Sequence, residues 1–269
     1  MQTIGLIGAG RMGLPIVGHL GRAGFRVLVS ERNAARAPDI AARRGELVEQ
    51  RVLAQESEAI LVCVGYDKEV RELLQAPGGL LESARPGTII AVLSTIHPKT
   101  MQELAQYAAS YDVHVVDSTV CRGGRAADEG TLLSFVGGPA DVVERLIPVL
   151  RAYSSDVVHS GGVGTAQVSK AANNLILWAC LVASHEGLAL AQRYEVDVDA
   201  LRSALMTSSA TNGALGNWGE QSMAWAQDDM AIVAEMADDC GISLPQSGVV
   251  REVCRTLKPR RYQLDKYGV

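Results

Sequence analysis

Residues 3–30 read TIGLIGAGRMGLPIVGHLGRAGFRVLVS, and this stretch decides the fold. The apolar run at residues 3–7 predicts a strand, residues 12–23 carry apolar side chains on one side as an amphipathic helix does, and residues 26–30 predict a second strand. The turn between the first strand and the helix, residues 8–13, matches the pattern G-x-G-x-x-G. A strand, this turn and a helix in that order predict a loop that binds the pyrophosphate of a dinucleotide.

Three glycines would give this loop its chemistry. Gly8 permits the tight turn, Gly10 lets the backbone approach a pyrophosphate, and Gly13 lets the helix pack closely on the strand. Glu31 follows the second strand, where its carboxylate would accept hydrogen bonds from ribose hydroxyls and repel a 2′-phosphate. We therefore expect NAD as the cofactor. Arg32, beside Glu31, leaves NADP open because a guanidinium could bind that phosphate.

Strand-like and helical stretches alternate up to about residue 160. Further strands are expected at residues 59–64, 88–94, 113–116, 131–136 and 156–159, with helices at 68–74, 99–110 and 140–152. Strands that alternate with helices predict βαβ units and a mostly parallel sheet. The fold class is therefore α/β, with an N-terminal doubly wound sheet of the Rossmann type.

The pattern changes after the glycine-rich segment at residues 160–164. Residues 165–193 form one long stretch rich in Ala and Leu that predicts a helix, and the remainder is also helical in pattern, with breaks near 212–216 and 241–245. We expect a dinucleotide-binding domain over residues 1–161. An all-helical domain for substrate binding and oligomerisation is expected over residues 162–269, beginning with a long interdomain helix.

Composition excludes several other classes of function. The net charge of −5, without a basic stripe, argues against a nucleic-acid partner. The five cysteines form no CxxC pair, which favours thiols in a reducing compartment, and the histidines lack metal-ligand spacing, so no metal is expected. The apolar start is interrupted by Gly8, Gly10 and Arg11, too early for a signal core or a membrane span. The expected location is the cytoplasm, with no membrane partner.

Four blocks of sequence, in order, resemble the β-hydroxyacid dehydrogenase family, which includes 3-hydroxyisobutyrate dehydrogenase and tartronate semialdehyde reductase. The first is the glycine loop, and the second, STIHP at residues 94–98, is similar to the family's S-T-x-x-P segment, whose Thr lies at the nicotinamide. The third, DSTVCRGG at 117–124, resembles the family's substrate loop. The fourth, GGVGTAQVSKAANN at 161–174, resembles the catalytic helix.

This resemblance implies hydride exchange between a nicotinamide and a small β-hydroxyacid or its semialdehyde, in a homodimer or homotetramer. It makes Lys170 the proton donor or acceptor and Asn174, at i+4 on the same helix face, a second catalytic residue. The residues expected to contact the cofactor are Gly8, Ala9, Gly10, Arg11, Met12, Gly13, Glu31, Arg32, Asn33, Val64, Thr95 and Gln227. The residues expected to contact the substrate are Thr95, Cys121, Arg122, Gly123, Lys170 and Asn174.

The chain departs from the family pattern at two of these places. The substrate loop has Cys121-Arg122-Gly123 where the family usually has Ser-Gly-Gly, and a late Lys-Asp pair is replaced by Gln227-Asp228. Cys121 is expected to be a small packing residue rather than a nucleophile. Two interpretations of Arg122 stay open: its guanidinium grips a second acidic or polar end of the substrate, or it points into solvent.

Two other functions also stay open. Imine reductases share this domain plan and use NADPH, but they generally lack the lysine, so Lys170 argues against that assignment. A non-catalytic dinucleotide-binding protein could use the same fold, because function lies in the site rather than in the fold. Lys170 and Asn174 together favour an enzyme.

Overall fold

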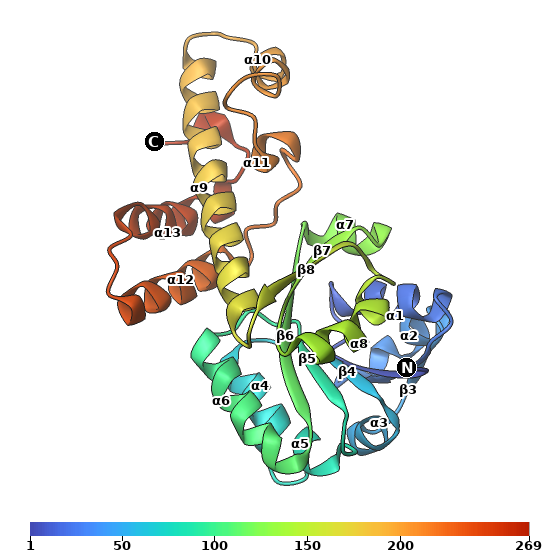
Figure 1. The fold of residues 1–269 in the computed structure, drawn as a ribbon. Helices are drawn as coiled ribbons and strands as arrows, with labels where there is room; N and C mark the ends of the chain where they lie inside the picture. The colour runs from blue at the N-terminus through green and yellow to red at the C-terminus, as the bar shows by residue number, and fades with distance from the viewer. Residues whose placement is uncertain (269) are drawn as a thin grey trace. The chain divides into compact units, whose positions relative to one another are not determined.

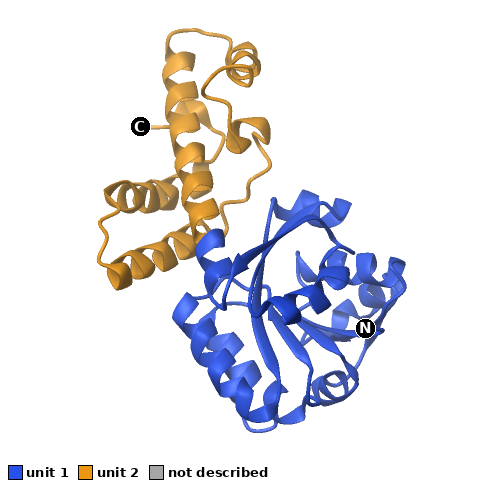
Figure 2. Cartoon of the chain, viewed as in Figure 1, with its two compact units in different colours: residues 1–170 blue, residues 171–269 orange. Residues whose placement is uncertain are grey.

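The computed structural model of the protein describes residues 1–268. The chain divides into two compact units, one over residues 1–170 and the other from residue 171 onward (Figure 2). The first unit contains strands and helices and the second contains helices, so the predicted fold class is confirmed. The division between the units falls within the long helix that begins at Thr165, a few residues after the boundary expected at residue 161.

The first unit is built on a sheet of eight strands in the order β3-β2-β1-β4-β5-β6-β7-β8 (Figure 1). The first six strands run parallel, β7 is antiparallel to β6, and β8 is parallel to β7. Strand order reverses between β1 and β4, which is where open α/β sheets bind ligands, outside the carboxyl ends of the strands. The strands are β1 (Thr3–Ile7), β2 (Arg26–Ser30), β3 (Gly45–Leu47), β4 (Ala59–Val62), β5 (Ile89–Val92), β6 (His114–Cys121), β7 (Leu132–Gly137) and β8 (Ser154–Gly161).

Helices cover both faces of this sheet. One hydrophobic core joins the sheet to α1, α2, α7 and α8, and a second core on the other face joins it to α3, α4, α5 and α6. In β2, Val27 and Val29 belong to the first core and Leu28 to the second, as the two-residue period of a strand requires. These helices are α1 (Gly13–Arg22), α2 (Ala37–Ala42), α3 (Gln50–Glu56), α4 (Asp67–Gln75), α5 (Leu80–Ser83), α6 (Pro98–Ala108), α7 (Gly123–Glu129) and α8 (Ala140–Leu150).

Strand β6 is longer than its sequence pattern predicts. Its first half pairs with β5, and its second half, residues 117–121, continues past the end of β5 and pairs with β7. The pattern of apolar residues ends at Val116 because Asp117, Ser118 and Thr119 are polar, although all three are buried. The extension carries the predicted substrate loop beyond the carboxyl edge of the parallel strands.

The second unit is a cluster of helices around the long helix α9. Trp178 and Leu181 of α9 lie in its main core, and the indole N–H of Trp178 donates to Asp229 Oδ2 at 3.1 Å. The C-terminal segment is bonded to the same helix, because the N–H of Tyr262 donates to Nε2 of His185 at 2.9 Å. The helices are α9 (Thr165–Arg193), α10 (Val198–Leu205), α11 (Gly213–Gly216), α12 (Ala226–Cys240) and α13 (Pro245–Leu257).

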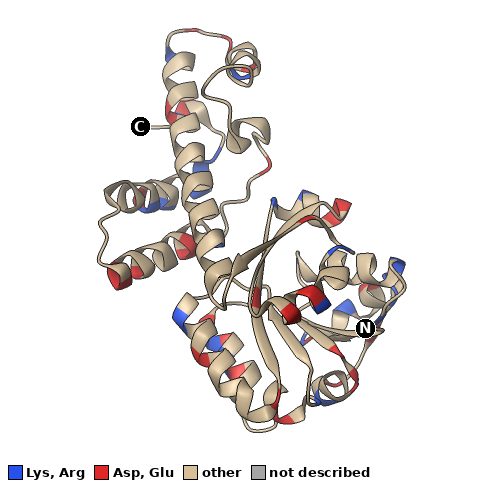
Figure 3. Cartoon of the chain, viewed as in Figure 1, with Lys and Arg blue, Asp and Glu red and all other residues tan. Residues whose placement is uncertain are grey.

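Within the described residues, α9 is the one helix long and apolar enough to cross a membrane by length and composition. Almost half of its most apolar window, 44%, is buried inside the protein, and core helices of soluble proteins meet the same criterion. Acidic and basic residues are interspersed along the ribbon of the first unit in Figure 3.

Candidate active site

The glycine loop between β1 and α1 packs tightly at two of its three glycines. Gly8 has a φ of +94°, and a Cβ there would lie 2.2 Å from the carbonyl oxygen of Cys63. A Cβ on Gly13 would lie 2.1 Å from the carbonyl oxygen of Gly8, whereas a Cβ on Gly10 would meet nothing within 4 Å. The loop is therefore closed against protein at two glycines and open at the third, an arrangement that fits the approach of a pyrophosphate.

The end of β2 meets this loop through Glu31. Its Oε2 accepts a hydrogen bond from the N–H of Ala9 at 2.8 Å, and its Oε1 accepts one from the N–H of Asn33 at 2.9 Å. Met12 occupies the N-cap of α1, and no side chain caps that helix by a hydrogen bond. A carboxylate beside an uncapped helix N-terminus fits the ribose and the phosphates of a dinucleotide.

Arg32, which follows Glu31, pairs with a residue of α4. Its side chain is 89% exposed and forms a 3.4 Å ion pair with Glu69. Glu69 Oε2 also accepts a hydrogen bond from the N–H of Gly65 at 2.6 Å. Exposed ion pairs contribute little to stability, so Arg32 can leave Glu69 for a ligand phosphate at small cost.

Arg11 connects the loop to α7. Its two terminal nitrogens donate to the two carboxylate oxygens of Asp128 at 2.8 and 2.6 Å, and this guanidinium holds the pKa of Asp128 below its usual value. The same guanidinium covers Gly124, where a Cβ would lie 2.5 Å from Nη2. Nε2 of His19, in α1, lies 3.0 Å from the carbonyl oxygen of Ala127. The loop and α7 are thus bonded to one another.

The ends of β4 and β5 are joined beside the loop. The hydroxyl of Ser94 donates to the carbonyl oxygen of Val64 at 3.0 Å, and the N–H of Val64 lies 3.2 Å from the same hydroxyl oxygen. Gln167, in α9, accepts from the N–H of Ile96 at 3.0 Å and donates to the carbonyl oxygen of Ser94 at 2.9 Å. These two bonds bracket Thr95, which is half-buried between them.

Asp117 of β6 fixes the start of α9 from the other side. Its Oδ1 accepts from the N–H of Gly164 at 2.8 Å and its Oδ2 from the N–H of Gln167 at 3.0 Å. Two residues further along β6, the hydroxyl of Thr119 donates to the carbonyl oxygen of Ala166 at 3.0 Å. Burial raises the pKa of Asp117 above its usual value, against the opposing effect of these backbone donors. The first turn of α9 is therefore held by hydrogen bonds to β6 and to the segment that follows β5.

Lys170 reaches the end of β6 from this fixed helix. Its Nζ donates to the carbonyl oxygen of Val120 at 2.7 Å and lies 3.9 Å from Sγ of Cys121. The lysine is half-buried rather than extended into solvent. An amine beside the predicted substrate loop has the chemistry to exchange a proton with an oxygen atom of a bound molecule.

The loop that follows Val120 has two left-handed residues in a row. Arg122 has a φ of +81° and Gly123 a φ of +74°. The guanidinium of Arg122 pairs with Asp156 Oδ2 at 2.7 Å and donates to the hydroxyl of Ser155 at 2.8 Å. The contact between this guanidinium and a substrate carboxylate stays a prediction. In the structure the guanidinium does not extend freely into solvent, because it is bonded to the start of β8.

Asn174 and Gln227 lie in the second unit. Asn174 is in α9, one turn after Lys170, and its Oδ1 accepts a hydrogen bond from Nδ2 of Asn173 at 3.0 Å. Asn174 is buried, and Gln227 is half-buried as the second residue of α12. Their predicted contacts with substrate and cofactor stay predictions.

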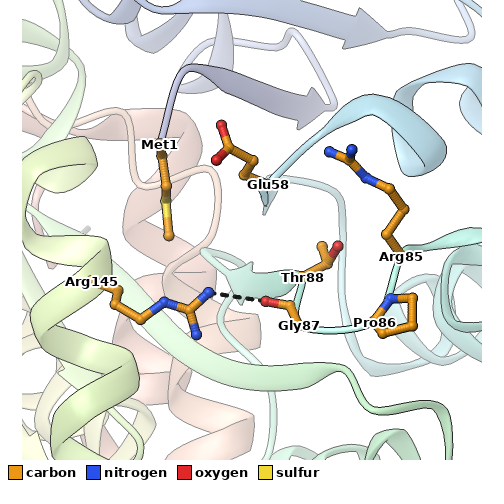
Figure 4. A pocket seen from close by; sticks show the side chains of 7 residues that line it. All are labelled: Met1, Glu58, Arg85, Pro86, Gly87, Thr88 and Arg145. Atoms are coloured by element: carbon orange, nitrogen blue, oxygen red, sulfur yellow. Dashed lines mark hydrogen bonds between the residues drawn. The ribbon is translucent and has the colours of Figure 1, made fainter.

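A cavity of about 600 Å³ lies at the amino ends of β1, β4 and β5, away from the glycine loop at their carboxyl ends. Arg145 donates across it to the carbonyl oxygen of Gly87 at 3.0 Å (Figure 4). It is lined by Met1, Glu58, Arg85, Pro86, Gly87, Thr88 and Arg145. Sheets of this kind bind ligands at the carboxyl ends of their strands, so this cavity is not the candidate site. No cluster of His, Cys, Asp and Glu suited to a metal ion occurs within residues 1–268.

Sequence reasoning gave no role to Asp117, Gln167 or Asp156, which the structure places around the candidate site. All three act by bonding to residues far away in the chain, at separations of 34 residues or more. The signal for Asp117 is a carboxylate that directly follows an apolar strand pattern. No comparable signal marks Asp156, an exposed residue at the start of a short strand pattern.

Two family profiles match the chain. Residues 3–162 match the profile described as the NAD binding domain of 6-phosphogluconate dehydrogenase. Residues 164–266 match the profile described as NAD-binding of NADP-dependent 3-hydroxyisobutyrate dehydrogenase. Together these matches extend over both units.

Individual proteins give the same result. The chain is 26% identical over 267 residues to an uncharacterised oxidoreductase of Bacillus subtilis, covering 98% of this chain and 92% of that protein. It is 30% identical over 216 residues to the 3-hydroxyisobutyrate dehydrogenase of Pseudomonas aeruginosa, covering 80% and 72%. The Mycobacterium tuberculosis 3-hydroxyisobutyrate dehydrogenase structure with L-serine aligns at a TM-score of 0.86 and 22% identity, covering 96% and 94%, which shows a shared fold.

Proposed function

The chain belongs to the β-hydroxyacid dehydrogenase family, and on this premise we propose that it interconverts a small β-hydroxyacid and its oxo or semialdehyde form. It is an NAD(P)-dependent dehydrogenase. The observation that carries the proposal is the amine of Lys170, which lies 2.7 Å from the carbonyl oxygen of Val120 in the predicted substrate loop. Substrate identity and the proton-transfer role of Lys170 are the proposed part.

The glycine loop and Glu31 are the proposed cofactor site, within a dinucleotide-binding domain over residues 1–161. The loop residues 8–13 would hold the pyrophosphate and Glu31 the adenosine ribose, with Arg32, Asn33, Val64, Thr95 and Gln227 as further contacts. When bound, the nicotinamide supplies the hydride transfer at the carbon that bears the hydroxyl. The carboxylate of Glu31 favours NAD, and Arg32, which is weakly paired, is placed to accommodate NADP.

Lys170 is the proposed proton carrier. Its amine gives a proton to the substrate oxygen during reduction and takes one from the hydroxyl during oxidation. In the structure this amine already donates to Val120, so a substrate oxygen would share the amine with that carbonyl or replace it. The amide of Asn174, one helical turn later, is the proposed second donor to the substrate, and it carries no charge.

The substrate carboxylate is proposed to bind the loop formed by Cys121, Arg122 and Gly123. Successive backbone N–H groups in a turn of left-handed residues can form a concave anion site. Cys121 is buried, and a Cβ on Gly123 would meet nothing within 4 Å, so a ligand can approach the backbone there. Thr95, held between the two bonds of Gln167, is the proposed contact on the β5 side.

The test is a spectrophotometric screen of small hydroxyacids and semialdehydes with NAD and NADP, followed by Lys170→Ala. We expect turnover with at least one β-hydroxyacid, and a loss of about 10²–10⁴-fold in kcat in the variant because the proton carrier is missing. Cofactor affinity should be unchanged. Lys68→Ala, which removes an exposed amine paired with Glu72 in α4, is the matched control.

Three outcomes would contradict the proposal. Turnover only of a cyclic imine with NADPH would identify an imine reductase. Cofactor binding with no turnover of any substrate would favour a non-catalytic dinucleotide-binding protein. Full activity in Lys170→Ala would remove the lysine from the chemistry.

The protein is also proposed to be a cytoplasmic homodimer or homotetramer that assembles through residues 162–269. Large apolar side chains of α9, such as Ile176 and Leu190, are exposed in the single chain. Exposed apolar patches on a soluble protein commonly mark contact surfaces. Light scattering on the purified protein measures the number of copies.

A further inference from the structure

We propose that Arg122 and Asp156 are positioning residues whose ion pair holds the end of β6 in place beside Lys170. The inference rests on the proposed function, because it assigns a task within the same loop. It also replaces a direct contact between the Arg122 guanidinium and the substrate by an indirect action through the backbone. Four features of the first unit carry it.

The first feature is the backbone of Arg122 itself. Its φ of +81° and ψ of 1° place an arginine in the left-handed region, which side chains with a Cβ adopt at an energetic disadvantage. Such a residue persists only where surrounding contacts determine its conformation. The contacts of the Arg122 side chain are therefore expected to stabilise this turn.

The second feature is the set of acceptors around its guanidinium. Nη1 lies 2.7 Å from Asp156 Oδ2, 2.8 Å from the hydroxyl oxygen of Ser155 and 3.0 Å from the carbonyl oxygen of Thr131. Thr131 precedes β7, and the other two residues lie at the start of β8. One guanidinium thus ties the end of β6 to the beginnings of the two strands beyond it.

The third feature is the charge on Asp156. The hydroxyl of Ser155 donates to Asp156 Oδ2 at 2.8 Å. Hydrogen bonds from Ser155 and then from Arg122 lower the pKa of this carboxyl below its usual value. Asp156 is therefore ionised at neutral pH, and a charge-assisted bond to a guanidinium is stronger than a neutral one.

The fourth feature is what lies directly before Arg122. The carbonyl of Val120 accepts the Lys170 amine at 2.7 Å, and Cys121 pairs with Leu133 of β7. A change of φ at Arg122 would swing the following peptide groups away from the strand end that Lys170 contacts. The ion pair therefore determines where the loop amides point relative to the amine.

An alternative is that this pair is an ordinary surface ion pair, since both side chains are about half exposed. Exposed pairs often contribute nothing measurable. The positioning role differs from that alternative because it predicts a change in substrate binding rather than in stability. It differs from direct substrate binding because Asp156, on β8, becomes as important as Arg122.

Three variants and one control separate these roles, and Asp156→Glu serves as the rescue variant. Asp156→Asn removes the negative charge that pairs with Arg122. Arg122→Ala removes the guanidinium, the anchor of the loop, but keeps a Cβ in the left-handed turn. Arg122→Gly removes the anchor and also permits that conformation freely. Glu129→Gln, which breaks an exposed ion pair with Arg125 on the neighbouring helix α7, is the matched control.

We expect Asp156→Asn to lower kcat/KM by about tenfold, mainly through KM, because small misplacements of binding groups have large kinetic effects. Arg122→Ala should lose more than Arg122→Gly, and Asp156→Glu should recover part of the loss. Hydrogen exchange of the backbone amides over residues 119–124 should be faster in Asp156→Asn and Arg122→Ala than in the wild type or in Glu129→Gln.

Unchanged KM together with unchanged exchange in Asp156→Asn would overturn the inference. So would equal increases of KM in the two Arg122 variants with a wild-type KM in Asp156→Asn, since that pattern indicates direct substrate contact. The exchange measurement needs no turnover. If the wild type turns over no hydroxyacid but the loop amides exchange faster in the variants, the proposed function fails and the positioning of the loop stands.

Discussion

At the scale of the residue, the glycine loop contains two glycines of different purpose. Gly13 lies against Gly8, where any Cβ would overlap a carbonyl oxygen, so its side chain is excluded by the protein itself. Gly10 faces open space, so only a ligand would exclude a side chain there. This difference allows the folding role and the binding role of the loop to be measured separately.

Gly10→Ala is expected to unfold at the wild-type Tm but to bind NAD at least about tenfold more weakly, or roughly 1.4 kcal/mol. Gly13→Ala is expected to lose stability of about 1–3 kcal/mol, as for other overpacked positions. Thermal unfolding without ligand and calorimetric titration with NAD measure the two effects. A wild-type Kd for NAD in Gly10→Ala would show that the pyrophosphate does not meet this loop.

The sequence predicted individual residues that belong to a motif. It did not predict residues whose role depends on a bond between distant segments of the chain. The segment that contains Lys170 could be recognised from its neighbours in the chain, and its amine does lie at the loop of residues 120–123. Asp117 and Gln167 hold the same helix through partners 47 to 73 residues away. No local pattern encodes such pairings, because they exist only once the strands are side by side.

At the scale of the element, α7 is the part that links the glycine loop to the predicted substrate loop. Arg11 covers its second residue, Gly124, and pairs with Asp128 near its end, while His19 contacts the carbonyl oxygen of Ala127. The helix therefore has no freedom to shift without breaking bonds to the glycine loop or to α1. A side chain at Gly124 would require the Arg11 guanidinium to move.

Gly124→Ala is expected to weaken NAD binding and raise KM, because the new Cβ would lie 2.5 Å from Nη2 of Arg11 and displace that guanidinium. The double variant Gly124→Ala with Arg11→Ala should regain part of the loss in KM relative to Gly124→Ala alone. Gly187→Ala, a helix position where a Cβ meets nothing within 4 Å, is the control. Strict additivity of the two substitutions would mean that they do not interact.

Elements with a continuous apolar pattern were predicted well. Strands β1 and β2 and helix α9 have the predicted bounds. Strand β3 was not predicted, because it has three residues at the edge of the sheet, two of them exposed, and so carries no apolar run. The second half of β6 was missed because two of its polar residues, Asp117 and Thr119, are bonded to the first turn of α9, which a strand pattern does not reveal.

At the scale of the whole molecule, both units have apolar cores, but the second also buries an imidazole. The first unit has two cores on either side of a sheet, and the second has two among its helices. Nδ1 of the buried His185 lies 2.8 Å from the carbonyl oxygen of Leu181, and its Nε2 accepts the Tyr262 N–H. Trp218 packs on the same ring at a centroid distance of 4.4 Å. The imidazole must therefore be neutral, with its proton on Nδ1.

Stability is expected to fall in mildly acidic solution because of His185. Burial lowers the pKa of this imidazole below its ordinary value of 6.5. As the pH falls below 6.5, the unfolded chain binds a proton before the folded one, so the free energy of unfolding decreases until the folded pKa is passed. Above pH 6.5 this contribution is complete and constant.

Tm measured from pH 7.5 down to 5 should therefore show a drop that His185→Gln reduces. The Gln amide can keep both hydrogen bonds, and it does not titrate. His114→Gln, at a half-buried histidine in the first unit, is the control. Identical pH dependence in the wild type and in His185→Gln would assign the drop to other groups.

The bonds that fix the first turn of α9 also limit how this stretch of chain can vary in length. A helix advances about 1.5 Å and rotates about 100° per residue. One extra residue between Gln167 and Lys170 would leave the Asp117 and Gln167 bonds intact and carry the amine about a quarter-turn away from Val120. Descendants of this sequence are therefore expected to keep the residue count along residues 164–170. Insertions and deletions are better tolerated after Arg193, where the helix has ended.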